Sequence, residues 1–265
     1  MLLKLEVEFV AGEEKYLDKK VNVEENKLTK TDACSIFTEI EKTEKYVAFI
    51  DILGYKDKID KCEKQGNLKD VALLNFIMNN NRIDAMDDLI TFVFSDCMYI
   101  VGDELQKVLE LLACISIQLL GASKIEVSNF AKETDINLIR GAITKGSLIV
   151  DERLNTLLGP AVNEVYILES QIAIYPRIII SNKIVDCESG EDFGEYFKED
   201  RDGIKYFDFL LFLHENKKYI MSKDEINRHI TFLKEYIENS DNVKIIQKYK
   251  WFEKYLSTRS EDTDE

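Results

Sequence analysis

The sequence predicts an α+β domain of the split βαβ or ferredoxin-like palm type, an antiparallel-rich sheet with helices on one face. The order of its elements predicts this fold, because β-rich runs and stretches of helical periodicity follow one another as β, α, β-hairpin, α, β, α, β. Composition agrees, because 45% of the 265 residues are hydrophobic and can bury a full core. With only two prolines and eleven glycines, no Pro/Gly/Ser-rich linker divides the chain.

Each element has its own local signal. The run at 46–53 is almost entirely apolar, which predicts a strand. At 89–102, two β-rich runs flank Ser95 and Asp96, which predicts a hairpin with these two residues at its tip. The other expected elements, in chain order, are a strand at 2–10, a polar segment as far as Lys69, helices at 70–80 and 104–120, a strand at 136–150, a helix at 161–174 and a strand at 176–181.

Charge and periodicity divide the chain into four expected parts. In chain order they are an N-terminal extension (1–44), a catalytic-type domain (45–182), a C-terminal helical extension (183–256) that starts with an acidic loop and ends in helices at 222–238 and 242–256, and a disordered acidic tail (257–265).

Composition excludes several classes of function. The formal charge of −15 argues against a protein that coats nucleic acid, because neutralising phosphates requires clustered lysine and arginine. The five cysteines are scattered without a CxxC pair, which excludes a zinc knuckle or a redox motif of that type. No apolar run approaches the roughly 20 residues that span a bilayer, and the first residues do not look like a signal peptide. We therefore expect a soluble cytoplasmic protein without a membrane or nucleic-acid partner.

Two aspartates carry the chemical argument. Asp51 lies within an apolar strand, where a carboxylate costs several kcal/mol unless it is paired or binds a cation. Asp96 lies at the hairpin tip, and Gly54 allows a tight turn directly after the first strand. Two carboxylates at the ends of neighbouring strands can share divalent metal, as phosphoryl-transfer sites require. Each aspartate alone could instead be a turn residue or a helix N-cap.

Four segments together resemble the class III nucleotidyl cyclases. They are YVAFIDILGYKDKI, FVFSDCMYIV, LIRGAITKGSLIV and LLGPAVNEVYILE, and they cover 45–181. The resemblance implies that Asp51 and Asp96 hold two Mn²⁺ or Mg²⁺ ions per site, with the carbonyl of Ile52 as a further ligand. It also implies that Asn163 orients the ribose. Ser95 stands where the family usually has glycine.

The chain departs from the purine cyclases at three positions. Phe92 and Thr156 occupy the places of the two residues that read a purine base, and Ile167 replaces an arginine that contacts phosphate. Arg177 and Arg140 are the candidate replacements for that arginine, although Arg140 could equally be a surface residue of a strand.

Nucleotide binding involves further residues. Tyr55 and Phe92 could contact the base, although an aromatic residue that flanks a strand is more often part of the core. The predicted catalytic residues are Asp51, Asp96, Asn163 and Arg177, and the predicted nucleotide-binding residues are Gly54, Tyr55, Phe92, Ser95 and Arg140.

Shorter strings, GPAVNEVYILES, AIYPRIII and KYKWFEKYL, are similar to the bacterial antiphage pyrimidine cyclases of the Pycsar systems. That resemblance implies conversion of UTP, or else CTP, to a cyclic mononucleotide that a separate effector senses. Class III cyclases commonly share their sites across a dimer, so a homodimer is expected. The alternatives are a cyclase-fold sensor that binds nucleotide without turnover, and a palm-type cyclic-oligonucleotide synthase, although the latter usually carries a Gly-Gly-Asp hairpin.

Overall fold

The computed structural model describes residues 41–66, 68–84, 88–122, 137–152, 154–188, 193–219 and 221–262. The expected strand at 2–10 and most of the N-terminal extension lie outside the described residues. The first described strand already begins at Thr43, so the expected boundary at residue 45 falls inside that strand.

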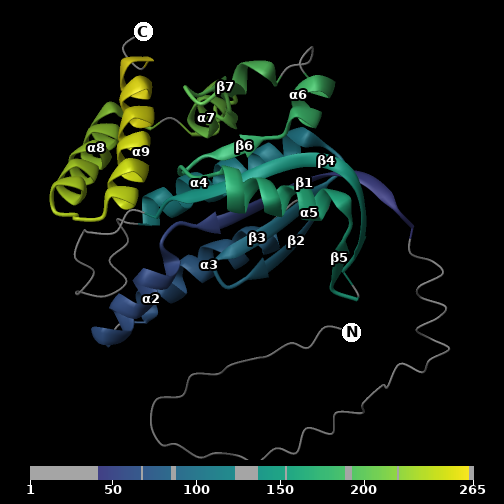
Figure 1. Ribbon diagram of the computed structural model, residues 1–265, viewed down its shortest axis with the longest axis horizontal. Coiled ribbons are helices and arrows are strands. Elements are labelled where there is room, and N and C mark those ends of the chain that lie inside the picture. The colour runs from purple at the N-terminus through teal and green to yellow at the C-terminus, as the bar shows by residue number, and fades with distance from the viewer. Residues whose placement is uncertain are drawn as a thin grey trace, which may run out of the picture. The chain divides into compact units, whose positions relative to one another are not determined.

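The described residues form an α+β fold around one mixed, mainly antiparallel sheet, as the sequence predicts (Figure 1). Its strand order is β2-β3-β1-β4-β6-β8-β7. Strand β5 stands outside this order and pairs with β4. Only β4 and β6 run parallel among these neighbours. The strands are β1 (Thr43–Ile52), β2 (Leu89–Phe94), β3 (Cys97–Gly102), β4 (Ile139–Asp151), β5 (Thr156–Leu158), β6 (Ile178–Ile180), β7 (Phe197–Glu199) and β8 (Lys205–Phe207).

Helices occupy most of the remaining described chain. They are α2 (Tyr55–Lys64), α3 (Lys69–Asp84), α4 (Leu105–Ala122), α5 (Pro160–Ile167), the π-helix η1 (Leu168–Ile172), α6 (Asn182–Glu188), the 3₁₀-helix η2 (Gly194–Tyr196), α7 (Phe209–Glu215), α8 (Lys223–Glu238) and α9 (Val243–Asp262). None of the helices in the described part of the chain has the length and apolar character needed to cross a membrane.

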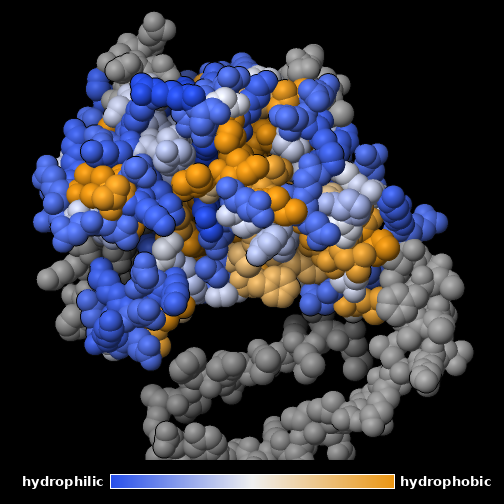
Figure 2. Space-filling model, in the orientation of Figure 1, coloured by the Kyte–Doolittle hydropathy of each residue, from blue (hydrophilic) through white to orange (hydrophobic). Residues whose placement is uncertain are grey.

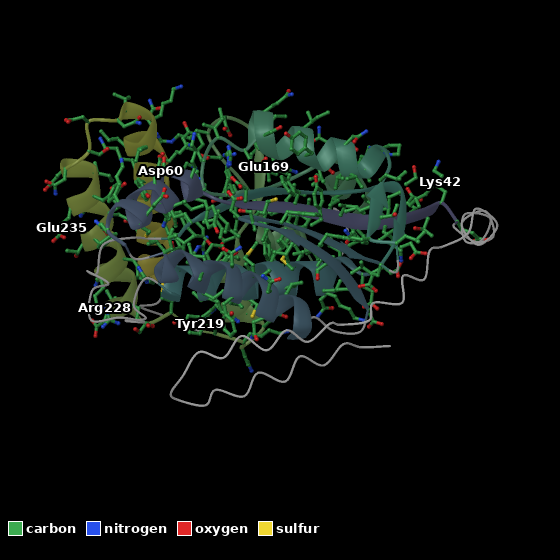
Figure 3. The ribbon with its side chains drawn as sticks, turned by 90° about the horizontal axis from the view of Figure 1, so that it is seen from below. Lys42, Asp60, Glu169, Tyr219, Arg228 and Glu235 are labelled. Atoms are coloured by element: carbon green, nitrogen blue, oxygen red, sulfur yellow. The ribbon has the colours of Figure 1, made fainter. Side chains whose placement is uncertain are left out.

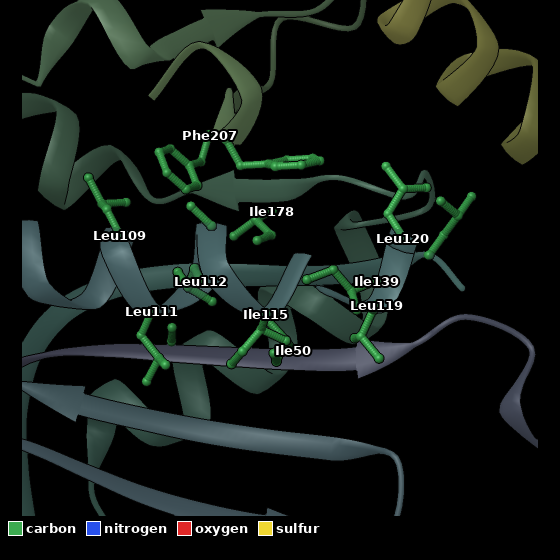
Figure 4. Close-up of a cluster of buried hydrophobic side chains, with 14 of the residues drawn as sticks. Ile50, Leu109, Leu111, Leu112, Ile115, Leu119, Leu120, Ile139, Ile178 and Phe207 are labelled. Carbon is green, nitrogen blue, oxygen red and sulfur yellow. The ribbon is translucent and has the colours of Figure 1, made fainter. Parts of the chain in front are cut away.

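Both faces of the sheet are covered, so the prediction of helices on one face was wrong. Alternate residues of β1 point to opposite faces, and Ile50 enters the larger core beneath α4 (Figure 4). Phe49 enters a second core, where Ala161 and Val165 of α5 pack against the strand. The physical reason lies in β1 itself, because an unbroken apolar strand is typical of a sheet buried on both sides.

Within the described residues, the predicted strands, hairpin and long helices are confirmed to within a few residues, but two local predictions were wrong. The segment after Gly54 is helix α2 rather than irregular polar chain, and its charged composition conceals the helix because few apolar positions mark a period. Helix α9 continues through 257–262, part of the tail expected to be disordered. There Arg259 pairs with the buried Asp208 at 2.6 Å, which ties the last helical turns to the core.

The C-terminal part belongs to the same core as the sheet. Strands β7 and β8 extend the sheet beyond β6, so the segment 183–256 is not only helical as predicted. Leu233 of α8 and Leu256 of α9 are fully buried in the cluster that contains α4. Three-residue strands are too short to show a period, which explains why the sequence did not reveal them.

Candidate active site

The end of β1 and the tip of the β2–β3 hairpin bring Asp51 and Asp96 together. In the antiparallel register, Asp51 lies opposite Cys97, the residue after Asp96. The backbone N–H of Ile52 donates to the carbonyl of Asp96 at 3.0 Å, which fixes the hairpin tip to the strand end. Ser95 turns the hairpin in the left-handed region, with a φ of 54°. Local backbone geometry therefore holds the two predicted metal ligands next to each other.

The two carboxyl groups are close enough to share a proton. Burial raises the pKa of Asp51 from its ordinary 3.8 to about 6, Arg140 opposes this shift, and the charge and hydrogen bond of Asp96 add to it. A second carboxylate nearby disfavours the ionised form, as in other paired carboxylates. A divalent cation between them would relieve this repulsion.

Arg140 and Glu169 complete a charged cluster around Asp51. Arg140 is the register partner of Asp51 across β1 and β4. Its Nε lies 3.3 Å from Oδ2 of Asp51 and 2.8 Å from Oε1 of Glu169. The side chain of Glu169 is only 3% exposed, and Figure 3 labels it among the side chains that crowd over the strands. Arg140 thus pairs with two carboxylates and is not a solvated surface arginine.

Three residues of this cluster were not predicted from the sequence. Glu169 lies in η1, and a π-helix has no readable sequence period, although such helices often occur at functional sites. Cys97 follows Asp96, and burial together with Asp96 and Asp51 raises the pKa of its thiol to about 11, so the thiol stays protonated. Lys248 of α9 interacts electrostatically with Asp51, Glu169 and Arg140 from far along the chain.

Arg177 does not belong to this cluster. Its side chain is 1% exposed, and its Nη1 and Nη2 lie 2.6 Å from Asp200 and 2.5 Å from Asp202. The guanidinium also lies over the rings of Tyr175 and Trp251. Two carboxylates already neutralise the charge of Arg177. The ion pairs hold the segment between β7 and β8 against the start of β6. They do not support the expectation that Arg177 binds phosphate.

The two aromatic candidates for base contacts are both buried. Tyr55 is 6% exposed, and its hydroxyl donates to Oδ1 of Asn75. Asn75 in turn donates to the carbonyl of Ser95 at 2.5 Å, so this chain of hydrogen bonds supports the hairpin tip. Phe92 is 5% exposed and lies opposite Tyr99 in the hairpin. Tyr55 therefore supports the site from within the core, the structural alternative that the sequence left open.

Gly54 shapes the start of α2 next to Asp51. It has a φ of 74°, in the left-handed region that favours glycine, and it is the N-cap of the helix. It offers no side chain to cap the first N–H groups of α2. Uncapped N–H groups at a helix N-terminus attract anions. The N–H groups at the start of α2 follow Asp51 by only a few residues.

Asn163 lies on the exposed side of α5, together with Tyr166 and Ile167, which are 53% and 46% exposed. Within the described residues its side chain makes no hydrogen bond to the carboxylate pair. Figure 2 shows apolar side chains gathered over α5 and η1. The large exposed apolar residues of this region are Leu158, Tyr166, Ile167, Ile172 and Ile174. They form an apolar face that includes Asn163.

The residues present fit divalent metal only as part of a composite site. Within the described ranges, no group of three or more His, Cys, Asp or Glu side chains could hold a metal ion alone. Asp51 and Asp96 provide hard carboxylate oxygens, and burial together with the neighbouring Asp96 raises the pKa of Asp51 in spite of Arg140. Backbone carbonyls such as that of Ile52, together with substrate phosphates, would complete the coordination.

No protein-family model matches the chain, and no curated protein matches it. Among solved structures, similar chains include the adenylyl cyclase CyaB from P. aeruginosa, at 17% identity and a TM-score of 0.47, with 64% of this chain and 94% of that chain covered. A monomeric guanylyl cyclase domain of the RhoGC fusion protein from the aquatic fungus Blastocladiella emersonii gives 17% identity, a TM-score of 0.45, and coverage of 63% and 96%. A bacterial light-regulated adenylyl cyclase gives 19% identity and a TM-score of 0.44, with 63% of this chain and 90% of that chain covered.

Proposed function

We propose that this protein is a metal-dependent nucleotidyl cyclase, which converts a nucleoside triphosphate to its 3′,5′-cyclic mononucleotide and pyrophosphate. The observation that carries the proposal is the pair of adjacent carboxylates of Asp51 and Asp96, held at two strand ends, where burial and the charge of Asp96 raise the pKa of Asp51. The ordered sequence motifs, which resemble those of class III cyclases, lead to the same reaction.

The residues of the site would divide the work of this reaction. The 3′-oxygen attacks the α-phosphorus, its proton passes to water, and the bond from phosphorus to the pyrophosphate oxygen breaks. Asp51 and Asp96 would hold divalent ions, which would supply activation of the 3′-hydroxyl and neutralisation of phosphate charge. The first N–H groups of α2, which no side chain of Gly54 caps, would bind phosphate oxygens. Arg140, once released from Asp51, can donate to the phosphates while Glu169 holds it.

We also propose that two copies of the chain share their sites. The support is the apolar face around Asn163, because large exposed apolar patches commonly mark interaction surfaces. A second copy is the occupant that gives Asn163 a function, since its side chain makes no hydrogen bond to the carboxylates of its own chain. In a two-fold dimer, Asn163 of one copy would complete the site of the other.

The substrate that we propose is a pyrimidine triphosphate, with UTP ahead of CTP. The buried Phe92 and the short Thr156 stand where purine cyclases read the base. The short strings similar to Pycsar cyclases support the same choice, and with it a role in antiphage defence through a separate effector that senses the cyclic nucleotide.

A nucleotide-binding sensor without turnover is the second candidate. Ile167, in place of a phosphate-contacting arginine, favours it, as does the pairing of Arg140 with Asp51. Incubating purified protein with Mn²⁺ and each of ATP, GTP, CTP and UTP, followed by mass analysis, separates the candidates. A cyclic mononucleotide supports the cyclase, a linked dinucleotide supports a palm synthase, and bound but unchanged nucleotide supports the sensor.

A further inference from the structure

The charge balance around Asp51 calls for another cation. In the described part of the chain, the guanidinium of Arg140 pairs with the carboxylates of Asp51 and Glu169, and Asp96 adds a third carboxylate beside Asp51. A nucleoside triphosphate brings several more negative charges into this cluster. Arg177 cannot supply this cation, because its guanidinium already pairs with two other aspartates.

Helix α9 is fixed beside this cluster by polar anchors. The indole Nε1 of Trp251 donates to Asp200 at 2.5 Å, and the hydroxyl of Tyr255 donates to Asp208 at 2.8 Å. Phe252 is 2% exposed within the core. Figure 1 shows the beginning of α9 at the end of the sheet toward which β1 runs. These anchors set which face of the helix points toward the site.

Lys248 lies on that inward face. It precedes Trp251 and Phe252 by three and four residues, the spacing at which helical side chains share a face. Its strongest electrostatic neighbours beyond its own helix are Arg140, Asp51 and Glu169, from three separate elements of the site. The side chain is half-buried, and its ammonium group makes no hydrogen bond or ion pair with the described residues. Burial and the charge of Arg140 lower the pKa of this ammonium group, and a bound anion would oppose both effects.

We propose that Lys248 binds the polyphosphate of the substrate, so that helix α9 supplies the second cation of the active site. The inference rests on the proposed function for the identity of the ligand, a nucleoside triphosphate. It gives the C-terminal segment a direct role in the site that the carboxylates form. Arg140 and Lys248 would then hold the phosphates from two sides.

Titration calorimetry with inorganic triphosphate and Mg²⁺ tests this role without requiring turnover. Because a charge-assisted hydrogen bond is involved, Lys248→Ala should weaken triphosphate binding by about tenfold or more. Lys248→Arg should retain most of the affinity, and Lys250→Ala, an exposed lysine of the same helix, should bind like the wild type. Melting temperatures of the three variants show whether each is folded.

In the nucleotide assay, Lys248→Ala should raise KM far more than it lowers kcat, because it removes a binding contact remote from the reacting oxygen. Unchanged triphosphate affinity in a folded Lys248→Ala variant overturns the inference, as does the absence of triphosphate binding in the wild type. Triphosphate binding that depends on Lys248 without any cyclic product supports the inference and overturns only the cyclase.

Discussion

Asp51 and Arg140 face each other across β1 and β4, with Nε of Arg140 3.3 Å from Oδ2 of Asp51. The guanidinium therefore lies against the carboxylate that we expect to bind metal. Glu169, at 2.8 Å from the same Nε, offers Arg140 a second partner. If Asp51 bound metal as we propose, Arg140 could move away from one carboxylate without losing the other. It would then be free to donate to a phosphate.

Asp51 should destabilise the metal-free protein as the pH rises. The folded state holds the proton of Asp51 up to a pKa of about 6, whereas the unfolded chain loses it near 3.8. The stabilising contribution is therefore complete below pH 3.8 and disappears as the pH rises through 6. The loss amounts to at most about 3 kcal/mol.

Urea unfolding in EDTA, from pH 4 to 8, measures this effect against Asp51→Asn, which keeps the shape of the side chain without its titration. The free energy of unfolding of the wild type should fall relative to that of the variant over this range. If the free energy of unfolding changed with pH in the same way for both proteins, the titration of Asp51 would not affect stability.

Asp51→Ala and Asp96→Ala should each abolish product formation while leaving the fold intact. Each variant removes one metal ligand, and neither removes a residue that the core requires. Circular dichroism confirms folding, and mass analysis of the nucleotide reaction measures activity. Wild-type turnover in either variant, with metal still required, refutes the assignment of that residue.

Arg177→Met should lower stability alone, whereas Arg140→Met should lower activity as well. Removing Arg177 leaves Asp200 and Asp202 without their buried partner, and breaking such a pair typically costs about 3–5 kcal/mol of stability. Removing Arg140 should lower activity as well as stability, because it also leaves the buried Glu169 without its cation. Thermal unfolding and product assays of both variants measure the contrast. Normal stability with lost activity in Arg177→Met would restore its phosphate role.

The sequence predicted the order of the elements because long apolar runs and helical periods are local signals. Strand β1, the hairpin around Asp96 and helix α4 all have such signals, and all three were located to within a few residues. The carboxylate pair was predictable for the same reason, because both aspartates interrupt apolar strands.

The rest of the site depends on tertiary contacts that no local pattern contains. Glu169 reaches Arg140 from a π-helix, and Lys248 comes from a helix almost two hundred residues after Asp51. Arg177 precedes a strand much as a site residue would, yet its partners lie on a short hairpin that the sequence did not reveal. Charged residues can be identified from sequence as candidates, but only the fold decides which carboxylates they meet.

A mixture of Asp51→Ala and Asn163→Ala chains should recover activity that neither variant shows alone. In a two-fold dimer with shared sites, a mixed dimer contains one doubly damaged site and one intact site. Random mixing makes about half the dimers mixed, so activity should rise to roughly a quarter of the wild type. Co-expression with two affinity tags isolates the mixed dimers. Inactive mixed dimers would mean that each chain builds its own site.

Metal binding by the carboxylate pair tests the central claim most directly. Titrating Mn²⁺ into the protein with a 3′-deoxynucleoside triphosphate, which cannot cyclise, and following free Mn²⁺ by electron paramagnetic resonance gives the number of ions bound. We predict that the wild type binds two ions per site in the presence of the analogue. Asp51→Ala and Asp96→Ala should lose this binding beyond what the nucleotide itself retains. Equal Mn²⁺ binding by the wild type and both variants would contradict the assignment of Asp51 and Asp96 as metal ligands.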